Sequence, residues 1–402
     1  MKQKVVIIGH GYTSRLGIIR SLAALDCEIT VVVMVLQNWW GRLIRLDIGK
    51  PVDCYSKYVQ HMYYCPAKDG DRLINLLLEK CTDSHQKVII IPDTDFSAMV
   101  IDNNQERLSE HFLFPHINHE QGAVGKWMDK KKQKSLAREV GLNVANSKIV
   151  NIVDGKYDIP ETIDYPCFTK PVITIVGGKQ YFKRCNTKED LSKLLDFASR
   201  EKNIRILVED FKDITTEYAV LGFSDGYNVV IPGIIEFIAN SKSHFGIARE
   251  GKVMPVKGFE GLLELFIEFV RHLGFCGLFD IDFFESGGKL YFSEMNLRFG
   301  GSGYAITKMG VNLPAMMVNY LSGNSYDGFP KSITTIATYV NERVCIDDWC
   351  YNYISEFDSQ KIINSRDIKF VYDEEDPGPS HKLERNIKLL RIKRVLKRWL
   401  KK

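Results

Sequence analysis

Oxygen-bearing side chains gather in one short stretch of the chain, GLFDIDFFESGGKLYFSEMNLRFGGSG. A turn predicted at residues 285–288 would close a hairpin and bring Asp282 and Glu294 to the same end of two paired strands. Asn296 joins them because side chains on a strand alternate between its two faces. Carboxylate and amide oxygens are ligands that suit Mg²⁺, with Mn²⁺ as the alternative ion. The stretch therefore predicts a metal site.

Two features of this hairpin leave alternatives open. Asp280 lies on the same strand face as Asp282, and the spacing between residues 282 and 294 favours Asp282 as the ligand. A hairpin that merely exposes polar residues to solvent is the other interpretation. Glu294 and Asn296 interrupt an apolar run just before a glycine-rich loop, and this favours the metal site.

A lysine and a glycine pair upstream predict a phosphate site. Lys170 lies inside the apolar run YPCFTKPV, where a charge without an anionic partner would be costly to bury. Gly177 and Gly178 follow, and glycines let backbone N–H groups approach phosphate oxygens closely. A glycine pair also forms ordinary hairpin turns. The preceding lysine and a later strand that ends at Glu209 favour phosphate binding.

The elements that carry these residues fall into two groups. Apolar β-branched runs at 4–8, 29–35 and 87–91, with a helical segment at 15–25, predict a βαβ unit with a parallel sheet. The loop GHGYTSRLG is an incomplete dinucleotide fingerprint, with Ser14 in place of the third glycine, so a tight strand-to-helix turn is preferred. The remaining elements predict an α+β unit with an antiparallel sheet: strands at 165–171, 204–209, 218–223, 229–235, 278–284 and 290–294, and a helix at 260–273.

The bulk properties exclude several classes of protein. A chain of 402 residues with 45% hydrophobic and 26% charged residues predicts two or three packed units. The net charge of +4 is small, and the nearly neutral body argues against a nucleic-acid partner. Nine cysteines without regular spacing predict neither a disulfide framework nor a zinc site, so we expect a cytoplasmic protein.

The end of the printed sequence is different in character. DEEDPGPS at 373–380 is acidic and turn-forming, and it predicts the end of the folded body. In the segment 381–402 a stripe of Leu389, Ile392, Leu396 and Trp399 is flanked by basic residues. This pattern predicts an amphipathic helix on a membrane surface, which would place the protein at the inner face of the membrane. A helix docked on the protein itself, or on a second copy in a homo-oligomer, is the alternative.

The order and spacing of these features resemble the ATP-grasp superfamily from Lys4 to about Asn341. The resemblance implies ATP and Mg²⁺ as cofactors and a role for each matching residue. Lys130 and Lys170 would hold the phosphates of ATP, and Gly177 and Gly178 would cover them. Glu209 and Phe211 would face the adenine, and Glu217 would bind the ribose. The metal would be held by Asp282, Glu294 and Asn296, and Arg298 would bind an acyl phosphate. Lys179 and Arg184 are interpreted as surface charges.

The same resemblance implies a division of the chain and a class of reaction. The expected segments are 1–120, an α/β domain before the ATP-grasp domain; 121–340, the ATP-grasp domain with a hinge near 209–211; 341–380, a C-terminal extension; and 381–402, the basic helix. The run EMNLRFGGSGYAITKMGVNLPAM is most similar to carboxylate-amine ligases of the D-aspartate ligase type.

Such a ligase would form ADP, activate a small carboxylic or amino acid, and join it to an amine acceptor on a cell-envelope precursor. Gly300, Gly301 and Ser302 would contact the substrate. An ATP-dependent carboxylase that uses bicarbonate is the alternative within the superfamily, and a nucleotide-binding protein without catalysis is the alternative outside it.

Overall fold

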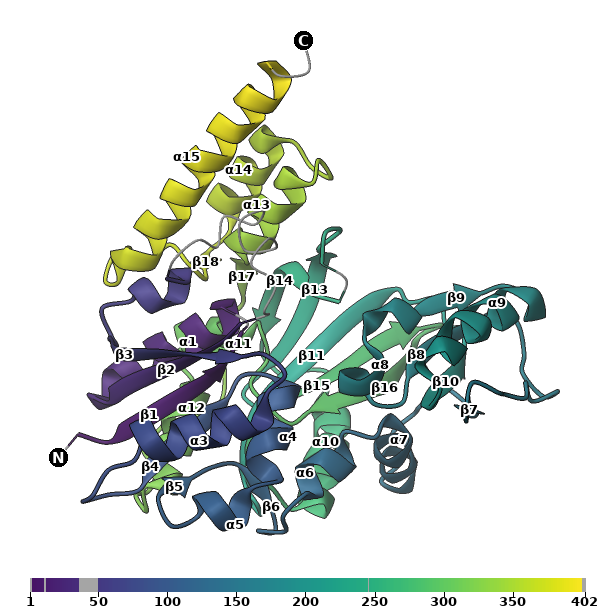
Figure 1. The fold of residues 1–402 in the computed structure, drawn as a ribbon, viewed down its shortest axis with the longest axis horizontal. Coiled ribbons are helices and arrows are strands. Elements are labelled where there is room, and N and C mark those ends of the chain that lie inside the picture. Colours follow the sequence, from purple (N-terminus) through teal and green to yellow (C-terminus); the bar gives the residue numbers. More distant parts are fainter. Residues whose placement is uncertain (1, 11, 36–49, 245, 400–402) are drawn as a thin grey trace.

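The computed structural model describes residues 2–10, 12–35, 50–244 and 246–399 (Figure 1). The first sheet is parallel, in the order β3-β2-β1-β4-β5, so the expected βαβ arrangement is confirmed. Its strands are β1 Lys4–Gly9, β2 Glu28–Val35, β3 Val59–Pro66, β4 Val88–Pro92 and β5 Phe112–Leu113. The helices are α1 Tyr12–Leu22, α3 Gly70–Lys80, α4 Asp95–Asp102 and α5 Gln105–Leu108.

Alternation along β1 explains why both faces of this sheet are covered. Val5 and Ile7 pack toward α1, whereas Val6 and Ile8 pack with residues of α3 and α4. Because successive side chains of a strand point to opposite faces, the continuous apolar run KVVII supplies both layers of the core.

A second, antiparallel sheet forms a lobe at the right of Figure 1. Its order is β7-β10-β8-β9, with β7 Ser147–Ile152, β8 Cys167–Pro171, β9 Lys183–Cys185 and β10 Ile204–Asp210. α9 Lys188–Ala198 packs on one face through Leu191, Leu194 and Leu195. Two helices lead into this lobe, α6 Ala123–Trp127 and α7 Lys130–Glu139.

The third sheet is the largest and connects the parts of the molecule. Its order is β16-β15-β11-β13-β14-β17-β18, and β12 and β6 pair at its side. The members are β6 His116–Ile117, β11 Thr216–Asp225, β12 Val229–Val230, β13 Ile234–Asn240, β14 Ala248–Met254, β15 Phe275–Ser286, β16 Lys289–Asn296, β17 Ala337–Val340 and β18 Ile368–Lys369. It is antiparallel except for the pair β17–β18. The helix predicted at 260–273 is α10 Glu260–Leu273.

The single strand predicted at 229–235 is wrong, because the structure has two strands, β12 and β13, in its place. Pro232 lies between them and has no N–H to donate to a neighbouring strand. Gly233 follows in a crowded position, where a Cβ atom would lie 2.7 Å from the carbonyl oxygen of Met254.

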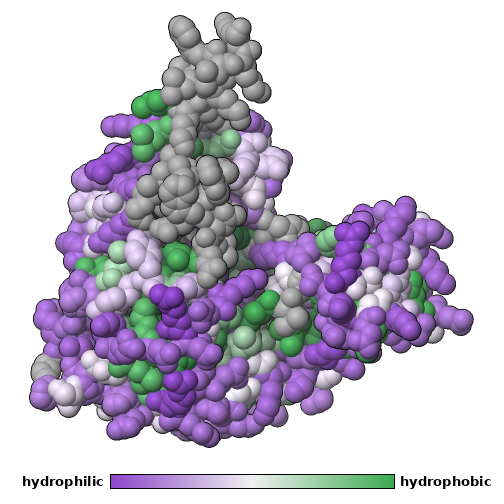
Figure 2. All heavy atoms as spheres, viewed as in Figure 1, coloured by the Kyte–Doolittle hydropathy of each residue, from purple (hydrophilic) through white to green (hydrophobic). Residues whose placement is uncertain are grey.

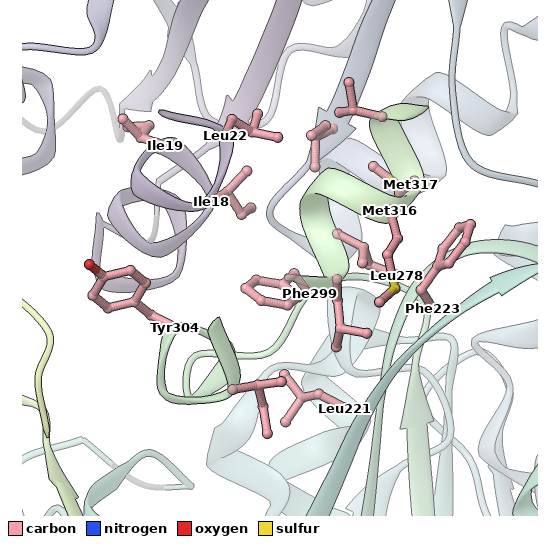
Figure 3. Close-up of a cluster of buried hydrophobic side chains, with 14 of the residues drawn as sticks. Ile18, Ile19, Leu22, Leu221, Phe223, Leu278, Phe299, Tyr304, Met316 and Met317 are labelled. Atoms are coloured by element: carbon pink, nitrogen blue, oxygen red, sulfur yellow. The ribbon is translucent and has the colours of Figure 1, made fainter. Parts of the chain in front are cut away.

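One apolar cluster joins the parallel sheet to the large sheet (Figure 3). Ile18 and Leu22 of α1 face Leu278 of β15 and residues of α12 Leu313–Leu321, and α11 Gly303–Lys308 adds Tyr304. These side chains are all buried, so the first domain and the hairpin that carries the acidic residues share one core.

The chain after residue 340 remains part of the folded body. α13 Glu342–Cys350 and α14 Glu356–Ser365 precede β18, and α15 Pro377–Trp399 follows it. The expectation that the body ends at 373–380 is wrong, since Asp376 is 1% exposed and pairs with Arg20 of α1 at 3.0 Å. The segment was expected to be solvated because it is acidic, but one of its acidic residues, Asp376, is the partner of a buried arginine.

The beginning of α15 packs on the protein's own surface. Leu383 and Asn386 are buried, and Ile387 packs against the cluster formed by α13 and α14. Leu389 and Ile392 of the predicted stripe are exposed, whereas the side chains of Leu396 and Trp399 lie outside the described residues. Within the described ranges, no helix has the length and apolar character needed to cross a bilayer.

Candidate active site

The carboxylates predicted to bind a metal lie on the hairpin of β15 and β16. Asp282 is directly opposite Glu294, and Asp280 is directly opposite Asn296, so all four side chains share one face of the sheet. The amide of Asn296 donates a hydrogen bond to Asp282 Oδ2 at 3.2 Å. The structure thus brings the three predicted ligands together. Asp280 lies beside them, opposite Asn296 and two residues before Asp282 on the same strand.

The turn of this hairpin is narrower than the four residues expected. β15 continues to Ser286 and β16 begins at Lys289, so Gly287 and Gly288 alone connect the strands. Both have positive φ, 57° and 70°, as the favoured two-residue hairpin turn requires. The glycine pair therefore fixes the register that sets the acidic residues opposite each other.

The electrostatics of the hairpin fit a bound divalent cation. Burial raises the pKa of Asp280 to about 7 although Arg298 opposes it, and burial with the charges of Asp280 and Glu294 raises the pKa of Asp282. Asp280 Oδ1 is buried without a hydrogen-bond partner among the described residues. A hard cation between these oxygens would offset their repulsion. Among the described residues, no three His, Cys, Asp or Glu side chains are placed to hold a metal ion by themselves. The candidate donors are Asp282 and Glu294 with the Asn296 amide.

Two predicted lysines converge on the same carboxylate. Lys130, the first residue of α7, forms an ion pair with Glu294, and Lys170 of β8 lies close enough to stabilise its charge. Burial alone would raise the pKa of Glu294, but the two lysines outweigh it and hold the pKa at about 2. The positively charged lysines therefore lie next to the candidate metal ligands, between the sheet that contains β8 and the sheet that contains β16.

Lys134 was missed by the sequence analysis and belongs to the same group. It lies one turn after Lys130 on α7, is 2% exposed, and pairs with Glu209 at 2.5 Å. Lys170 pairs with the other oxygen of Glu209 at 3.0 Å. Burial and the charge of Lys170 lower the pKa of Lys134 to about 8, whereas Lys170, which also faces Glu294, has a raised pKa. The spacing of four residues in a lysine-rich helix was the available signal.

The hinge residues take different positions from one another. Glu209 is the next-to-last residue of β10 and its carboxylate pairs with the two lysines, so an adenine contact for this side chain stays a prediction. Phe211 follows, and the guanidinium of Arg184 lies 4.2 Å from the centre of its ring. Arg184 is exposed, as expected of a surface charge, and it also covers this aromatic ring beside the hinge.

Glu217 lies on the face of the large sheet that carries the acidic residues. β11 pairs with β15 so that Ala219 is opposite Asp282, and Glu217 is two residues away on the same face. The side chain amide of Asn240, at the end of β13, donates to the Glu217 carboxylate. Glu217 therefore lies on the same face as the acidic residues, its contact with a ribose stays a prediction, and Asn240 is an additional polar group there.

The glycine pair lies in a helical turn rather than a hairpin. Gly177 ends α8 Thr174–Gly177, and Gly178 has a φ of 70°, a conformation that favours glycine. Lys179 follows immediately, and the charges of Glu294 and Asp282 act on it, although burial lowers its pKa overall. Lys179 is exposed, as expected of a surface charge, but it lies close enough to the acidic residues for their charges to act on it.

Arg298 connects the hairpin to the first domain. Its Nε atom donates to Asp95 Oδ1 at 2.7 Å, and a second nitrogen lies 3.5 Å from the Asn296 amide oxygen. Gly300 lies directly beneath Asp280, where a Cβ atom would collide with the carboxylate. The other two residues predicted to contact the substrate lie in different surroundings. Gly301 is exposed, whereas the hydroxyl of Ser302 lies 2.9 Å from the hydroxyl of Tyr339.

The first domain contributes acidic residues that the sequence analysis did not select. Asp93 and Asp95 follow β4, and the hydroxyl of Ser14, in the first turn of α1, donates to Asp93. Parallel sheets bind ligands at the carboxyl ends of neighbouring strands whose connections run in opposite directions. β1 ends at Gly9 and α1 begins at Tyr12, as the expected tight strand-to-helix turn requires. Arg15 of α1 is buried, pairs with Asp53 at 2.5 Å and donates to the carbonyl oxygen of Gly9.

Comparison with known proteins agrees with this geometry. Residues 135–310 match the family model of the ATP-grasp domain, and the chain has the ATP-grasp fold. It is 25% identical over 237 residues to the carbamoyl phosphate synthase large chain of Gemmatimonas aurantiaca. It is 26% identical over 179 residues to the formate-dependent phosphoribosylglycinamide formyltransferase of Nitratiruptor sp.. These matches cover 57% and 44% of this chain, which spans only 21% and 45% of the two relatives.

Solved structures show the same fold over most of the chain. N5-carboxyaminoimidazole synthetase from Staphylococcus aureus matches with a TM-score of 0.61 and 16% identity, covering 89% of this chain and 87% of that one. L-amino acid ligase from Bacillus licheniformis matches with a TM-score of 0.60 and 18% identity, covering 84% and 79%. At these identities the likeness establishes the fold alone.

Proposed function

We propose that this chain is an ADP-forming ATP-grasp ligase that activates a carboxylate as an acyl phosphate and joins it to an amine. The observation that carries the proposal is the convergence of Lys130 and Lys170 on Glu294, opposite Asp282. Cations that suit phosphates thus adjoin oxygen ligands that suit the metal of Mg-ATP.

The residues would divide the work as follows. Asp282, Glu294 and Asn296 would hold Mg²⁺, which supplies charge neutralisation for the transferred phosphoryl group. Lys130 and Lys170 now pair with carboxylates, and phosphate oxygens would replace these partners.

The chemistry proceeds in two steps that balance without another reactant. A carboxylate oxygen attacks the γ-phosphorus, the bond to the β-phosphate oxygen breaks, and ADP leaves. The amine then attacks the acyl carbon, the C–O bond to phosphate breaks, and inorganic phosphate and one proton are released. Arg298 lies where its guanidinium could stabilise the oxyanion, an interaction typically worth about 3 kcal/mol.

The first domain favours an amine over bicarbonate as the second substrate. Asp95 places negative charge beside Arg298, where an ammonium group would be attracted. We extend the proposal to an acceptor on a cell-envelope precursor and to a reducing cytoplasm, in which the nine cysteines, all free thiols, would remain reduced.

The test combines Mg-ATP with pools of carboxylic acids and amino acids and measures nucleotide products by chromatography. Hydroxylamine serves as a small amine, because it converts an acyl phosphate to a hydroxamate that mass spectrometry identifies. We expect ADP, phosphate and a hydroxamate that depends on one acid. AMP and pyrophosphate would exclude the mechanism. ADP formation that requires bicarbonate would identify a carboxylase, and nucleotide binding without turnover would leave a binding protein.

A further inference from the structure

Large apolar side chains are exposed together on the C-terminal helices. Five of the fourteen exposed large hydrophobic residues of the described chain lie between residues 351 and 392, although this segment is a tenth of the sequence. They are Tyr351, Tyr353, Phe357, Leu389 and Ile392. Phe357 is the most exposed of all fourteen, at 77%. Such a concentration indicates a surface that contacts an apolar partner.

Three of these side chains come from α14 and α15, which contact each other, and the two tyrosines lie in the turn between α13 and α14. Arg391 of α15 pairs with Glu356 of α14 at 2.7 Å. Phe357 and Ile392 are the next residues along each helix, so they lie near the same contact. Leu389 is three residues before Ile392 and shares its side of the helix. The opposite side of α15 is buried through Leu383, so the exposed residues are not the ones that attach the helix.

The sequence of the last helix and of the residues after it is strongly basic. Residues 382–402 contain ten Lys or Arg and one Glu, whereas the whole chain has a net charge of only +4. The pair with Glu356 neutralises one of the basic residues, Arg391, and leaves a large excess. In Figure 2, hydrophobic atoms interrupt the hydrophilic surface at the upper end of the molecule, and Figure 1 shows α15 projecting from the sheets there.

We propose that α14, α15 and the turn after α13 form an interfacial surface that binds an anionic lipid bilayer. Exposed aromatic and aliphatic side chains beside a basic helix fit the boundary between headgroups and acyl chains. Electrostatic attraction to anionic headgroups supplies the part of the binding that added salt screens. The partner is the bilayer surface, and binding involves no passage of the chain across the membrane.

Co-sedimentation of the full chain with vesicles tests this assignment. One vesicle contains phosphatidylcholine alone, and the other contains phosphatidylcholine with about a third phosphatidylglycerol. We expect binding to the anionic vesicle only, reduced by 0.5 M salt. The double variant Phe357→Ser, Ile392→Ser should bind at least tenfold more weakly. Tyr227→Ser is the matched control, because Tyr227 is 74% exposed on a distant turn and should not affect binding.

Thermal unfolding of each variant checks that the fold is intact. Equal binding of the double variant and the native chain would overturn the proposal, as would an absence of binding to anionic vesicles. Analytical ultracentrifugation provides the remaining outcome: a dimer abolished by the same double variant, without vesicle binding, would assign this surface to a second copy of the chain.

Discussion

Individual side chains in the site separate two candidate ligands that the sequence could not distinguish. Asp282 faces Glu294 and accepts a hydrogen bond from Asn296, whereas an oxygen of Asp280 lies against Gly300. We expect Asp282→Asn and Glu294→Gln each to lower ADP formation by roughly 100-fold, as loss of a metal ligand would. Asp280→Asn should be milder. Magnesium titrations of ADP formation provide the measurement, and the reverse order of effects would assign the ligand role to Asp280.

The pKa of Lys134 predicts a pH dependence for ATP binding. With a pKa of about 8, this lysine loses its positive charge as the pH rises through 8, whereas Lys170 keeps its proton because its pKa is raised. The KM for ATP should therefore increase between pH 7 and pH 9. Lys134→Met should have a KM about tenfold higher at pH 7, equivalent to about 1.4 kcal/mol, and a weaker pH dependence.

Lys131→Met is the matched control for this measurement, since Lys131 is an exposed neighbour on the same helix. Its KM should follow that of the native chain at every pH. A Lys134→Met variant with the native pH profile would show that another group titrates.

Site residues whose partners lie nearby in the sequence could be predicted, whereas those whose partners lie far away along the chain could not. Asp282, Glu294 and Asn296 were predictable because a hairpin with period-two alternation relates them locally. Lys134 was ambiguous among four lysines in five residues, and only burial distinguishes it. Asp95 pairs with Arg298 across 203 positions, and no local pattern indicates that contact.

At the scale of elements, α13 holds the loop between β13 and β14 over the site. Asp348 Oδ1 accepts hydrogen bonds from the Ser241 hydroxyl at 2.9 Å and from the Ser243 hydroxyl and N–H at 2.7 and 2.9 Å. Asn240, just before this loop, bonds Glu217, and Gly246 within it lies near Lys179. The segment after residue 340 therefore positions groups at the site.

We expect Asp348→Ala to raise the KM for ATP and to lower the free energy of unfolding by about 3 kcal/mol, because several buried donors lose their acceptor. Denaturant unfolding and steady-state kinetics measure the two effects. Ser355→Ala is the control: it removes the cap of α14, costs about 1 kcal/mol, and leaves the KM unchanged. An unchanged KM in Asp348→Ala would show that the loop does not need this anchor.

The sequence predicted elements better than their limits. The α10 helix and the strands at 204–209 and 278–284 follow from periodicity, and each is extended or matched in the structure. The break in the strand at 229–235 arises from Pro232, a signal present in the sequence. Residues 373–380 belong to the folded body because of a tertiary contact with Arg20, and the composition of the segment does not reveal that contact.

At the scale of the whole molecule, the two ends of the described chain are joined. Arg20 donates to Asp376 and to the carbonyl oxygens of Phe370 and Val371, and it is 7% exposed. A chain that stops after Ser365 should leave this guanidinium without acceptors and be digested rapidly by protease. A chain that stops after Ile392 keeps Asp376 and Leu383 and should resist digestion as the full chain does. Equal resistance of both would contradict the importance of this contact.

The contact between Arg20 and Asp376 also has a consequence for synthesis. The ribosome delivers α1 early, but the acceptors of Arg20 emerge about 350 residues later, as do β17 and β18 of the large sheet. Contacts so distant in sequence form slowly, and surfaces that await them are prone to misassociate. The nascent chain would thus expose the side of α1 that carries Arg20 for most of its translation. The packing around Arg20 would be complete only when translation has passed residue 376, and until then the growing chain would be a natural client for chaperones.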